Sequence, residues 1–390
     1  MGHRYAVLGA GRQGIAAAYD IAKFGDAEEV RVVDADLAVA EAGAERINEL
    51  LGQRIATAIR ADASDAAQLV PVLDGVTSFV SAVPYHLNLA ITEVAVRVGA
   101  NMCDLGGNTG IVRKQLQLDA EAKAAGVSII PDCGMGPGMN ISLATYAMSL
   151  IDRPREVFIW DGGLPQDPKP PWNYVVTFHI GGLTNEYYGN AYFLRGGKIT
   201  EVPCFDGLEE LDFPPPLGRL EAPVTSGGLS TAPWTFEGQL ERLENKTLRY
   251  PGHWAQFKAF AQLGLLEVEP VQVGKVKVVP REVLHALLEP KITRPEIRDV
   301  GVVRTKCVGD KDGHPAEAIV QLIDFYDDET GFTAMRRLTG WHASIVAILA
   351  AHERIARGAM PVELAIPGPT IVEEARRRGF DIEEHVVAVE

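Results

Sequence analysis

The chain has 390 residues, of which 47% are apolar and 23% are charged. This length predicts two or three domains. The composition is that of a globular protein, which excludes a mainly disordered chain. Lys and Arg number 37 against 52 Asp and Glu, so the formal net charge is −15. An acidic surface repels a phosphate backbone, and we expect no nucleic-acid partner.

Cysteine spacing and hydropathy indicate the compartment. The chain has no C-x-x-C pair, and its four cysteines lie far apart, at Cys103, Cys133, Cys204 and Cys307. This favours free thiols in a reducing compartment over a disulfide framework or a structural zinc site. No apolar run approaches the roughly 20 residues that span a bilayer. We therefore expect a cytoplasmic protein with no membrane partner.

The first third of the chain alternates short apolar runs with helical patterns. Such alternation predicts an α/β fold, a doubly wound parallel sheet of the Rossmann type with helices on both faces. The expected strands are residues 5–8, 30–33, 55–59, 77–83, 101–105 and 127–130. The expected helices are residues 15–23, 37–51, 87–98 and 112–125.

The pattern changes near residue 156 to longer alternating strands that are separated by turns. This is typical of antiparallel pairing and predicts an inserted α+β domain. Its expected strands are residues 157–160, 174–180, 186–194, 198–202, 299–308 and 317–325, and residues 212–238 are expected to form a long loop. Helices are expected at 254–263, 340–357 and 371–378. We divide the chain into domains at 1–140 and 141–338, with a helical segment at 339–390 that packs back on the first domain.

The clearest motif is a glycine fingerprint between the first strand and the first helix. It reads Gly9-Ala10-Gly11-Arg12-Gln13-Gly14. Gly9 permits a tight turn, Gly11 lets the backbone approach a pyrophosphate, and Gly14 lets the helix pack close to the sheet. The helix N-terminus would bind the phosphates, with Arg12 and Gln13 in its first turn. The alternative, a glycine-rich turn without a ligand, is the weaker interpretation in this strand-to-helix context.

Asp34 ends the second strand, twenty positions after Gly14. A carboxylate there accepts hydrogen bonds from ribose hydroxyls and repels a 2′-phosphate, which favours NAD over NADP as the cofactor. Asp62, at the end of the third strand, is a candidate neighbour of the adenine ring or simply the cap of the next turn. At the end of the fourth strand, the residues expected along the cofactor are Ala82, Val83 and Pro84.

Ionisable residues follow the fourth, fifth and sixth strands. In a doubly wound sheet the reacting ring lies outside the carboxyl ends of the strands. The residues there include Tyr85 and His86, then Asp104, then Asp132 and Cys133. His86, Asp104 and Asp132 are candidates for a general base, and Tyr85 and Cys133 for substrate contacts. Singly, His86 could cap a helix, Asp132 could bind its own loop and Cys133 could be core. Together they favour a catalytic site.

Other kinds of catalytic site lack their motifs. The chain contains neither H-E-x-x-H nor a paired-histidine spacing for zinc, and it has no G-x-S-x-G elbow. The sequence therefore predicts a nicotinamide-dependent enzyme with no metal.

Four segments resemble the saccharopine dehydrogenase family, and within it the group of NAD-dependent L-lysine 6-dehydrogenases. They are Val83-Pro84-Tyr85-His86, Pro131-Asp132-Cys133-Gly134 with Gly136-Pro137-Gly138, Gly162-Gly163-Leu164-Pro165 with Pro168-Lys169-Pro170-Pro171, and Lys246-Thr247-Leu248-Arg249-Tyr250-Pro251-Gly252-His253. The resemblance runs from Tyr5 to about Gly379. It implies a nucleotide domain, an inserted domain for substrate binding and dimerisation, and a homodimer. It also implies oxidation of the lysine side-chain amine to allysine, which cyclises to a piperideine carboxylate, plus ammonia.

Further candidates for substrate binding lie in the second domain. The planar fork of Arg249 suits an α-carboxylate, although an exposed strand arginine is an equal alternative. His253 could face the ligand or cap a helix, and weaker candidates are Lys169, His179 and Thr225. Two other functions stay open: dehydrogenation of a secondary amine of the saccharopine or carboxyspermidine type, and a nucleotide-sensing homologue without turnover.

Overall fold

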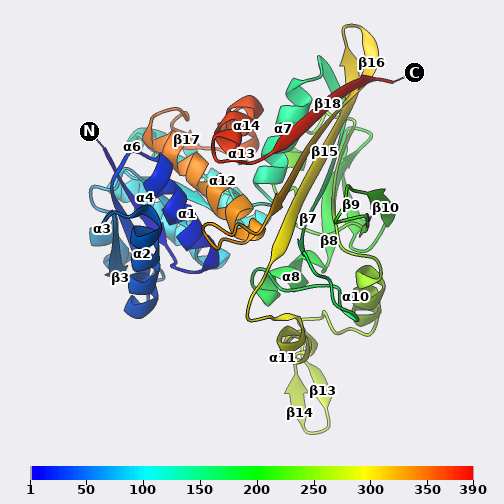
Figure 1. Cartoon of the computed structure of the whole chain (residues 1–390), viewed down its shortest axis with the longest axis horizontal. Helices are drawn as coiled ribbons and strands as arrows, with labels where there is room; N and C mark the ends of the chain where they lie inside the picture. The colour runs from blue at the N-terminus through cyan, green and yellow to red at the C-terminus, as the bar shows by residue number, and fades with distance from the viewer. Residues whose placement is uncertain (1, 390) are drawn as a thin grey trace.

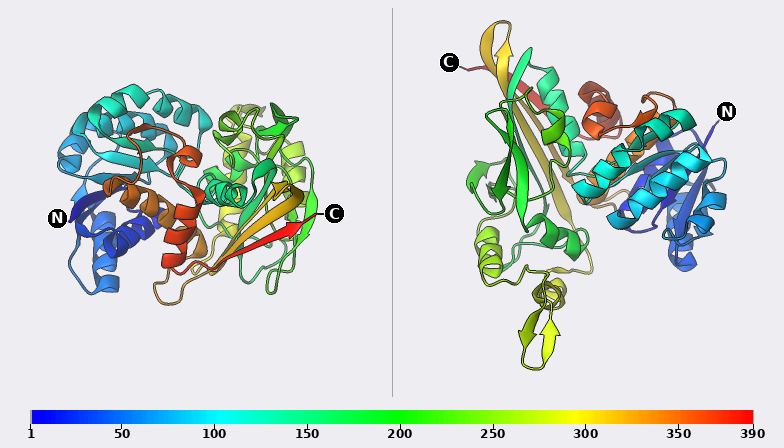
Figure 2. Two further views of the ribbon diagram at one scale, coloured as in Figure 1. Left: turned by 90° about the horizontal axis from the view of Figure 1, so that it is seen from above. Right: turned by 180° about the vertical axis from the view of Figure 1, so that it is seen from behind.

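The computed structural model describes residues 2–389. Two seven-stranded sheets dominate it, one in each half of the molecule (Figures 1 and 2). The first sheet has the strand order β17-β6-β5-β4-β1-β2-β3, and its strands are parallel. This is the predicted Rossmann-type sheet. Within residues 2–389 no helix combines the length and apolarity of a membrane span.

Alternation of strand and helix builds the first sheet as expected. The strands are β1 (His3–Leu8), β2 (Ala27–Asp34), β3 (Ala56–Arg60), β4 (Ser78–Ser81), β5 (Asn101–Asp104), β6 (Ser128–Ile130) and β17 (Gly358–Ala359). The helices between them are α1 (Arg12–Phe24), α2 (Leu37–Leu51), α3 (Ala66–Leu73), α4 (Asn88–Val98), α5 (Thr109–Leu116) and α6 (Asp119–Ala125), with the short 3-10 turn η1 (Tyr85–Leu87). The single helix predicted at 112–125 is therefore two helices.

The second sheet has the order β18-β16-β15-β7-β12-β8-β9. Its strands are β7 (Arg153–Pro165), β8 (Asn190–Arg195), β9 (Lys198–Pro203), β12 (Arg242–Thr247), β15 (Asp299–Lys311), β16 (His314–Phe325) and β18 (Ile382–Ala388). β12 runs parallel to β7, so the sheet is mixed rather than purely antiparallel. The helices of this half are α7 (Met139–Ser149), α8 (Ile180–Glu186), α9 (Ala232–Thr235), α10 (His253–Gln262) and α11 (Pro280–Ile292).

Two predictions in this half are wrong. Residues 174–180 form no strand, and Tyr174, Val175, Val176 and Thr177 are all buried, so the segment lacks the one-sided burial of a sheet surface. Residues 212–238 are not a continuous loop, because they contain most of the hairpin of β10 (Glu209–Asp212) and β11 (Arg219–Ala222) and all of α9. A second small hairpin, β13 (Val271–Val273) with β14 (Val276–Val278), projects from the body beside α11 (Figure 1).

The C-terminal segment connects both halves. α12 (Ala334–Ala351) packs along α1, where Gly340 leaves no room for a side chain because a Cβ would lie 2.9 Å from backbone atoms of Gln13 and Ala17. The short helices α13 (Val362–Ala365) and α14 (Gly368–Arg377) contact α7. The last strand, β18, then pairs with β16 of the second sheet. The helices thus return to the first half as expected, whereas the chain ends in the second.

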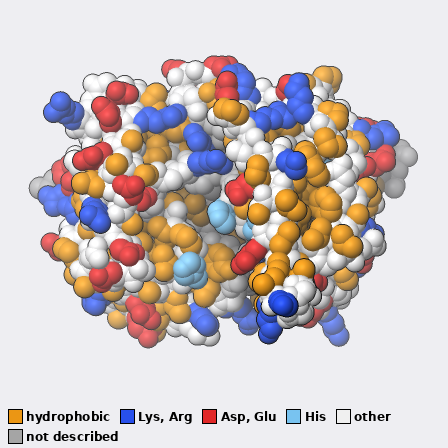
Figure 3. Space-filling model, turned by 90° about the horizontal axis from the view of Figure 1, so that it is seen from below, with side chains coloured by type: hydrophobic (Ala, Val, Ile, Leu, Met, Phe, Trp, Pro, Cys, Tyr) orange, Lys and Arg blue, Asp and Glu red, His pale blue; other side chains and the backbone are white. Residues whose placement is uncertain are grey.

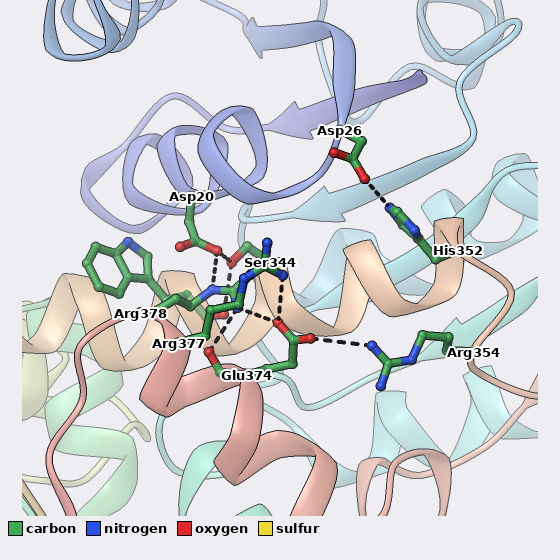
Figure 4. Close-up of polar contacts among 9 residues, drawn as sticks. Asp20, Asp26, Ser344, His352, Arg354, Glu374, Arg377 and Arg378 are labelled. Atoms are coloured by element: carbon green, nitrogen blue, oxygen red, sulfur yellow. Dashed lines mark hydrogen bonds and ion pairs between the residues drawn. The ribbon is translucent and has the colours of Figure 1, made fainter. Parts of the chain in front are cut away.

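A buried ion-pair cluster fastens this segment (Figure 4). Arg378, beyond α14, donates through Nε to Asp20 of α1 at 2.7 Å and through Nη1 to Glu374 at 2.7 Å. Ser344 of α12 also donates to Asp20. The side chains of Arg378 and Asp20 are fully buried, so each charge depends on the other for its solvation.

Candidate active site

The glycine fingerprint has the geometry of a phosphate-binding turn. Gly9 has a φ of +94°, and a Cβ at Gly14 would overlap the carbonyl of Gly9, so both positions require glycine. Gly11 caps α1 without a side chain, and a Cβ there would meet nothing within 4 Å. The first N–H groups of this 13-residue helix have no partner within the helix, and no side chain at Gly11 stands between them and a ligand. Arg12 is exposed and Gln13 half-buried in this first turn, so the residues present fit a dinucleotide pyrophosphate.

Asp34 lies at the end of β2 beside this turn. Its carboxylate accepts hydrogen bonds from the backbone N–H of Ala10 at 2.9 Å and of Asp36 at 3.0 Å. Both oxygens keep lone pairs for ribose hydroxyls, because a carboxylate has about four acceptor sites. Asp62, the candidate neighbour of the adenine ring, is exposed. Its carboxylate accepts hydrogen bonds from the backbone N–H and the hydroxyl of Ser64, so it caps the turn that follows β3.

The end of β4 borders the same turn. A Cβ at Gly9 would lie 2.8 Å from the carbonyl of Ala82 and 3.2 Å from Val83, so these residues face the glycine turn. Pro84 caps η1, which carries Tyr85 and His86. The face in Figure 3 is hollowed between the two halves, and histidine side chains are visible in the hollow.

Asp104 ends β5 and is 1% exposed. Its Oδ1 accepts from the backbone N–H of Gly106 at 2.8 Å and of Asp132 at 3.3 Å, and its Oδ2 accepts from Gln115 at 2.7 Å. Burial raises the pKa of Asp104, and these three donors oppose the shift. Because both oxygens are held, Asp104 is suited to position the neighbouring strand end.

Asp132 follows β6 and is 2% exposed, with a φ of +64°. Ser230 donates to its Oδ2, whereas its Oδ1 has no hydrogen-bond partner within residues 2–389. Burial, and next the charge of Asp104, raise the pKa of Asp132 well above its ordinary range. A base that works near neutral pH needs such a shift, and its unpartnered oxygen distinguishes Asp132 from Asp104.

Cys133 is buried, and both its N–H and its thiol bond backbone carbonyls. Its N–H donates to the carbonyl of Asp104 at 2.7 Å, and its thiol donates to the carbonyl of Ile130 at 3.3 Å. Burial raises the pKa of the Cys133 thiol well above its ordinary value, so the thiol stays protonated. Its carbonyl bonds the ring of His342, whose pKa burial lowers to about 4. The neutral ring donates through Nδ1 to Cys133 and accepts through Nε2 from Ser142.

Tyr85 and His86 lie at the rim of the strand ends. His86 is exposed, and its ring centroid is 6.1 Å from that of Tyr85. The ring of Tyr85 packs on Gly107, where a Cβ would lie 3.0 Å from Cδ1. Neither side chain has a polar partner within the described residues that would fix its role.

Arg249 is buried in the second half, not exposed on a strand. Its Nε donates to the hydroxyl of Tyr187 at 2.9 Å, and its Nη1 donates to the carbonyl of Leu248 at 2.8 Å. Its Nη2 lies 3.8 Å from the carboxylate of Glu186. Tyr187 in turn shares a 3.0 Å hydrogen bond with Nε2 of His253, so His253 supports this cluster from within the core.

The three weaker candidates have local partners. Lys169 forms an exposed ion pair with Asp167, and His179 caps α8 by accepting the N–H of Gly181. Thr225 is buried and shares a 2.6 Å hydrogen bond with Thr247. Thr225 also lines a small cavity with Ser230 and Asn245.

Several residues at the junction of the two halves escaped the sequence analysis. Asp161 of β7 accepts from Asn140 at 2.7 Å and from Asn245 at 3.3 Å. A Cβ at Gly136 would lie 2.8 Å from Asp161, so this carboxylate lies against the loop that follows Asp132. Burial raises the pKa of Asp161 to about 6. Among residues 2–389 no group of three or more His, Cys, Asp and Glu side chains is arranged to hold a metal ion.

Family models match nearly the whole chain. Residues 5–130 match the saccharopine dehydrogenase NADP-binding domain, and residues 134–379 match the saccharopine dehydrogenase C-terminal domain. Among curated proteins, the saccharopine dehydrogenase (NADP⁺, L-glutamate-forming) of Saccharomyces cerevisiae is 23% identical over 61% of this chain and 55% of its own length. The carboxynorspermidine synthase of Vibrio cholerae is 25% identical over 65% of this chain and 63% of its own length. The alpha-aminoadipic semialdehyde synthase of Mus musculus is 24% identical over 63% of this chain but only 27% of its own length.

Solved structures support the same fold. Apo saccharopine dehydrogenase (L-Glu forming) from S. cerevisiae superposes with a TM-score of 0.79 at 19% identity, over 99% of this chain and 100% of that one. Homospermidine synthase from Legionella pneumophila, in complex with NAD, gives a TM-score of 0.66 at 12% identity over 99% and 92%. The matched segment spans less than two thirds of each curated relative named above, so their activities are not carried over. On the family models and the shared fold, the chain belongs to the saccharopine dehydrogenase family.

Proposed function

We propose that the protein is an NAD-dependent oxidoreductase that oxidises a side-chain amine of an amino acid, with L-lysine as the best candidate. The products would be allysine, which cyclises to a piperideine carboxylate, and ammonia. The supporting observation is Asp132, a buried carboxylate with a raised pKa and an unpartnered oxygen at a strand end. The relatives' printed names, which include saccharopine dehydrogenase and carboxynorspermidine synthase, are consistent with an amine substrate.

The cofactor proposal rests on the first domain. When bound, the nicotinamide accepts a hydride from the carbon that carries the amine. The N-terminus of α1 would hold the pyrophosphate, and Asp34 would accept the ribose hydroxyls. Asp34 would also repel a 2′-phosphate, which supports NAD over NADP although the family model is described as NADP-binding.

The chain's own residues supply the proton chemistry. A lysine side-chain amine has an ordinary pKa near 10.4, so it arrives protonated and must lose a proton before hydride can leave the carbon. Asp132 can take this proton through its unpartnered Oδ1. Asp104 positions the strand end and sustains the raised pKa of Asp132. After this proton has been released to solvent, Asp132 can accept a proton from the water that adds to the oxidised carbon and return it to the ammonia that leaves.

A secondary-amine substrate of the saccharopine or carboxyspermidine type is the second candidate. Such a substrate carries an additional carboxylate arm and needs a second cation. Two cations of the second domain, Lys169 and Arg195, are already in ion pairs, Lys169 with Asp167 and Arg195 with the buried Glu244. These occupied cations favour the smaller substrate. A nucleotide-sensing homologue without turnover is the third candidate, and the buried carboxylates Asp104 and Asp132 argue against it.

The direct test incubates the purified protein with NAD or NADP and a panel of amines while the absorbance of the reduced nicotinamide is followed. We expect reduction of NAD with L-lysine. Turnover with saccharopine alone would replace the leading candidate by the second. Tight NAD binding without turnover on any amine would favour the sensing protein. A homodimer remains a prediction, which sedimentation of the same preparation tests.

A further inference from the structure

We propose that Arg249, Glu186 and Tyr174 form a subsite that binds the zwitterionic end of an α-amino acid, with Arg249 on the carboxylate and Glu186 on the α-ammonium group. This inference rests on the proposed function and defines its substrate class. It makes Glu186 a specificity-determining residue that separates amino acids from carboxylates without an α-amino group, while Arg249 separates amino acids from simple amines.

The Arg249–Glu186 pair is loose. Nη2 of Arg249 lies 3.8 Å from Oε2 of Glu186, whereas charge-assisted hydrogen bonds are roughly 2.7–2.9 Å long. Nε and one Nη1 hydrogen of Arg249 are committed to Tyr187 and to the carbonyl of Leu248. The hydrogens on Nη2 are therefore without an acceptor at bonding distance. These hydrogens are therefore available to an anionic group of a ligand.

Glu186 is the accessible side of the pair. Its side chain is 32% exposed, whereas that of Arg249 is only 3% exposed. The backbone of Glu186 is fixed at the end of α8, because its carbonyl accepts the N–H of Ser226 at 2.8 Å. Its carboxylate has no closer cation than Arg249 among the described residues. A ligand that enters beside Glu186 would reach Arg249 next.

An unpartnered hydroxyl supports a ligand at this place. Tyr174 is 3% exposed, its ring centroid lies 5.0 Å from the guanidinium carbon of Arg249, and its hydroxyl has no hydrogen-bond partner among the described residues. Burial raises the pKa of Tyr174 to about 12, so the hydroxyl is a donor, and the charges of Arg249 and Glu186 both act on it.

A zwitterion matches this arrangement. Inserted antiparallel to the pair, its carboxylate would accept from Nη2 of Arg249 and from the Tyr174 hydroxyl, and its ammonium group would donate to Glu186. The subsite lies near Asp161, because Arg249 opposes the burial that raises the pKa of Asp161, and the charge of Asp161 adds to the burial that raises the pKa of Glu186. Asp161 in turn lies against Gly136, in the loop that follows Asp132.

The test compares three ligands that differ by one group. L-Lysine has both charged groups, 6-aminohexanoate lacks the α-ammonium group, and 1,5-diaminopentane lacks the carboxylate. In Glu186→Gln we expect kcat/KM for L-lysine to fall by about tenfold or more, because a hydrogen bond to a charged group is lost, while the value for 6-aminohexanoate stays within about twofold. In Arg249→Lys we expect kcat/KM to fall for both ligands that carry a carboxylate, L-lysine and 6-aminohexanoate. The value for 1,5-diaminopentane should stay the same.

The matched control is Glu267→Gln. Glu267 is an exposed carboxylate in the same domain that accepts a hydrogen bond from the hydroxyl of Tyr188, and its substitution should leave the ratios of kcat/KM among the three ligands unchanged. Equal losses for L-lysine and 6-aminohexanoate in Glu186→Gln, or no loss, would overturn the subsite. Titration calorimetry of the same ligands separates this result from failure of the proposed function. If Glu186→Gln weakened binding of L-lysine but not of 6-aminohexanoate, and no ligand were turned over, the subsite would be supported and the proposed dehydrogenase activity rejected.

Discussion

At the scale of single residues, the two strand-end aspartates differ in how their oxygens are used. Both oxygens of Asp104 are held by protein donors, whereas Oδ1 of Asp132 has none. We expect Asp132→Asn to lower kcat by about 10²–10⁴-fold, the contribution of a positioned general base, because an amide cannot take the substrate proton. Binding of NADH, followed by its fluorescence, should be unchanged. Retention of most of the activity would exclude Asp132 as the base.

Asp104 should affect the pH dependence of activity at the same site. A base works as the carboxylate, so activity rises as pH passes its pKa, and the charge of Asp104 contributes to the raised pKa of Asp132. Asp104→Asn removes that like charge, which lowers the pKa of Asp132. We expect the acid limb of the kcat/KM profile to move to lower pH in this variant. A limb that stays in place or moves upward would contradict the coupling of the two carboxylates.

Asp34 tests the cofactor preference. Asp34→Ser combined with Ala35→Arg removes the negative charge and supplies a cation for a 2′-phosphate, so the ratio of kcat/KM for NADP to that for NAD should rise by about tenfold or more. The control is Asp36→Asn, because Asp36 caps α2 and asparagine caps equally well. An unchanged ratio in the double variant would show that the ribose lies elsewhere.

What the sequence could and could not predict follows from the range of each contact. Gly9, Asp34, Asp104 and Asp132 were found because the position of a residue at a parallel strand end sets its place in the site. Ser230 bonds Asp132 across 98 positions of sequence, and no local pattern encodes that pairing. Arg249 was predicted to bind a carboxylate, but its burial beside Glu186 depends on tertiary packing.

At the scale of elements, the first half followed its periodicity closely and the second half did not. α2 has the predicted bounds, since its cap and apolar spacing are local signals. β18 was missed because all but the first of its residues are exposed, and its six exposed side chains include both Glu and Val, so no alternation marks it. The apolar run at 174–177 resembled a strand because apolar runs do not show which surface buries them.

The buried cluster of α1, α12 and α14 gives a prediction at this scale. Arg378→Met should destabilise the fold by about 3–5 kcal/mol, because Asp20 and Glu374 would lose a buried partner. The matched control is Arg377→Met, whose side chain is 58% exposed and lies 3.7 Å from Glu374, and which should cost about 1 kcal/mol or less. Urea unfolding followed by tryptophan fluorescence measures both. Equal effects would mean that the cluster does not fasten the C-terminal segment.

At the scale of the whole molecule, the acidic charge acts in opposite directions on the two proposed ligands. A formal net charge of −15 attracts cationic amines and repels the anionic NAD, and salt screens both effects because the Debye length falls from above 10 Å to below it. Between about 0.05 M and 0.5 M NaCl, we expect KM for 1,5-diaminopentane to rise, KM for L-lysine to rise less, and KM for NAD to fall. Steady-state kinetics at several salt concentrations measure all three values. If the three constants moved in the same direction, the surface charge would play no part in selecting the substrate, and selection would depend on contacts within the site alone.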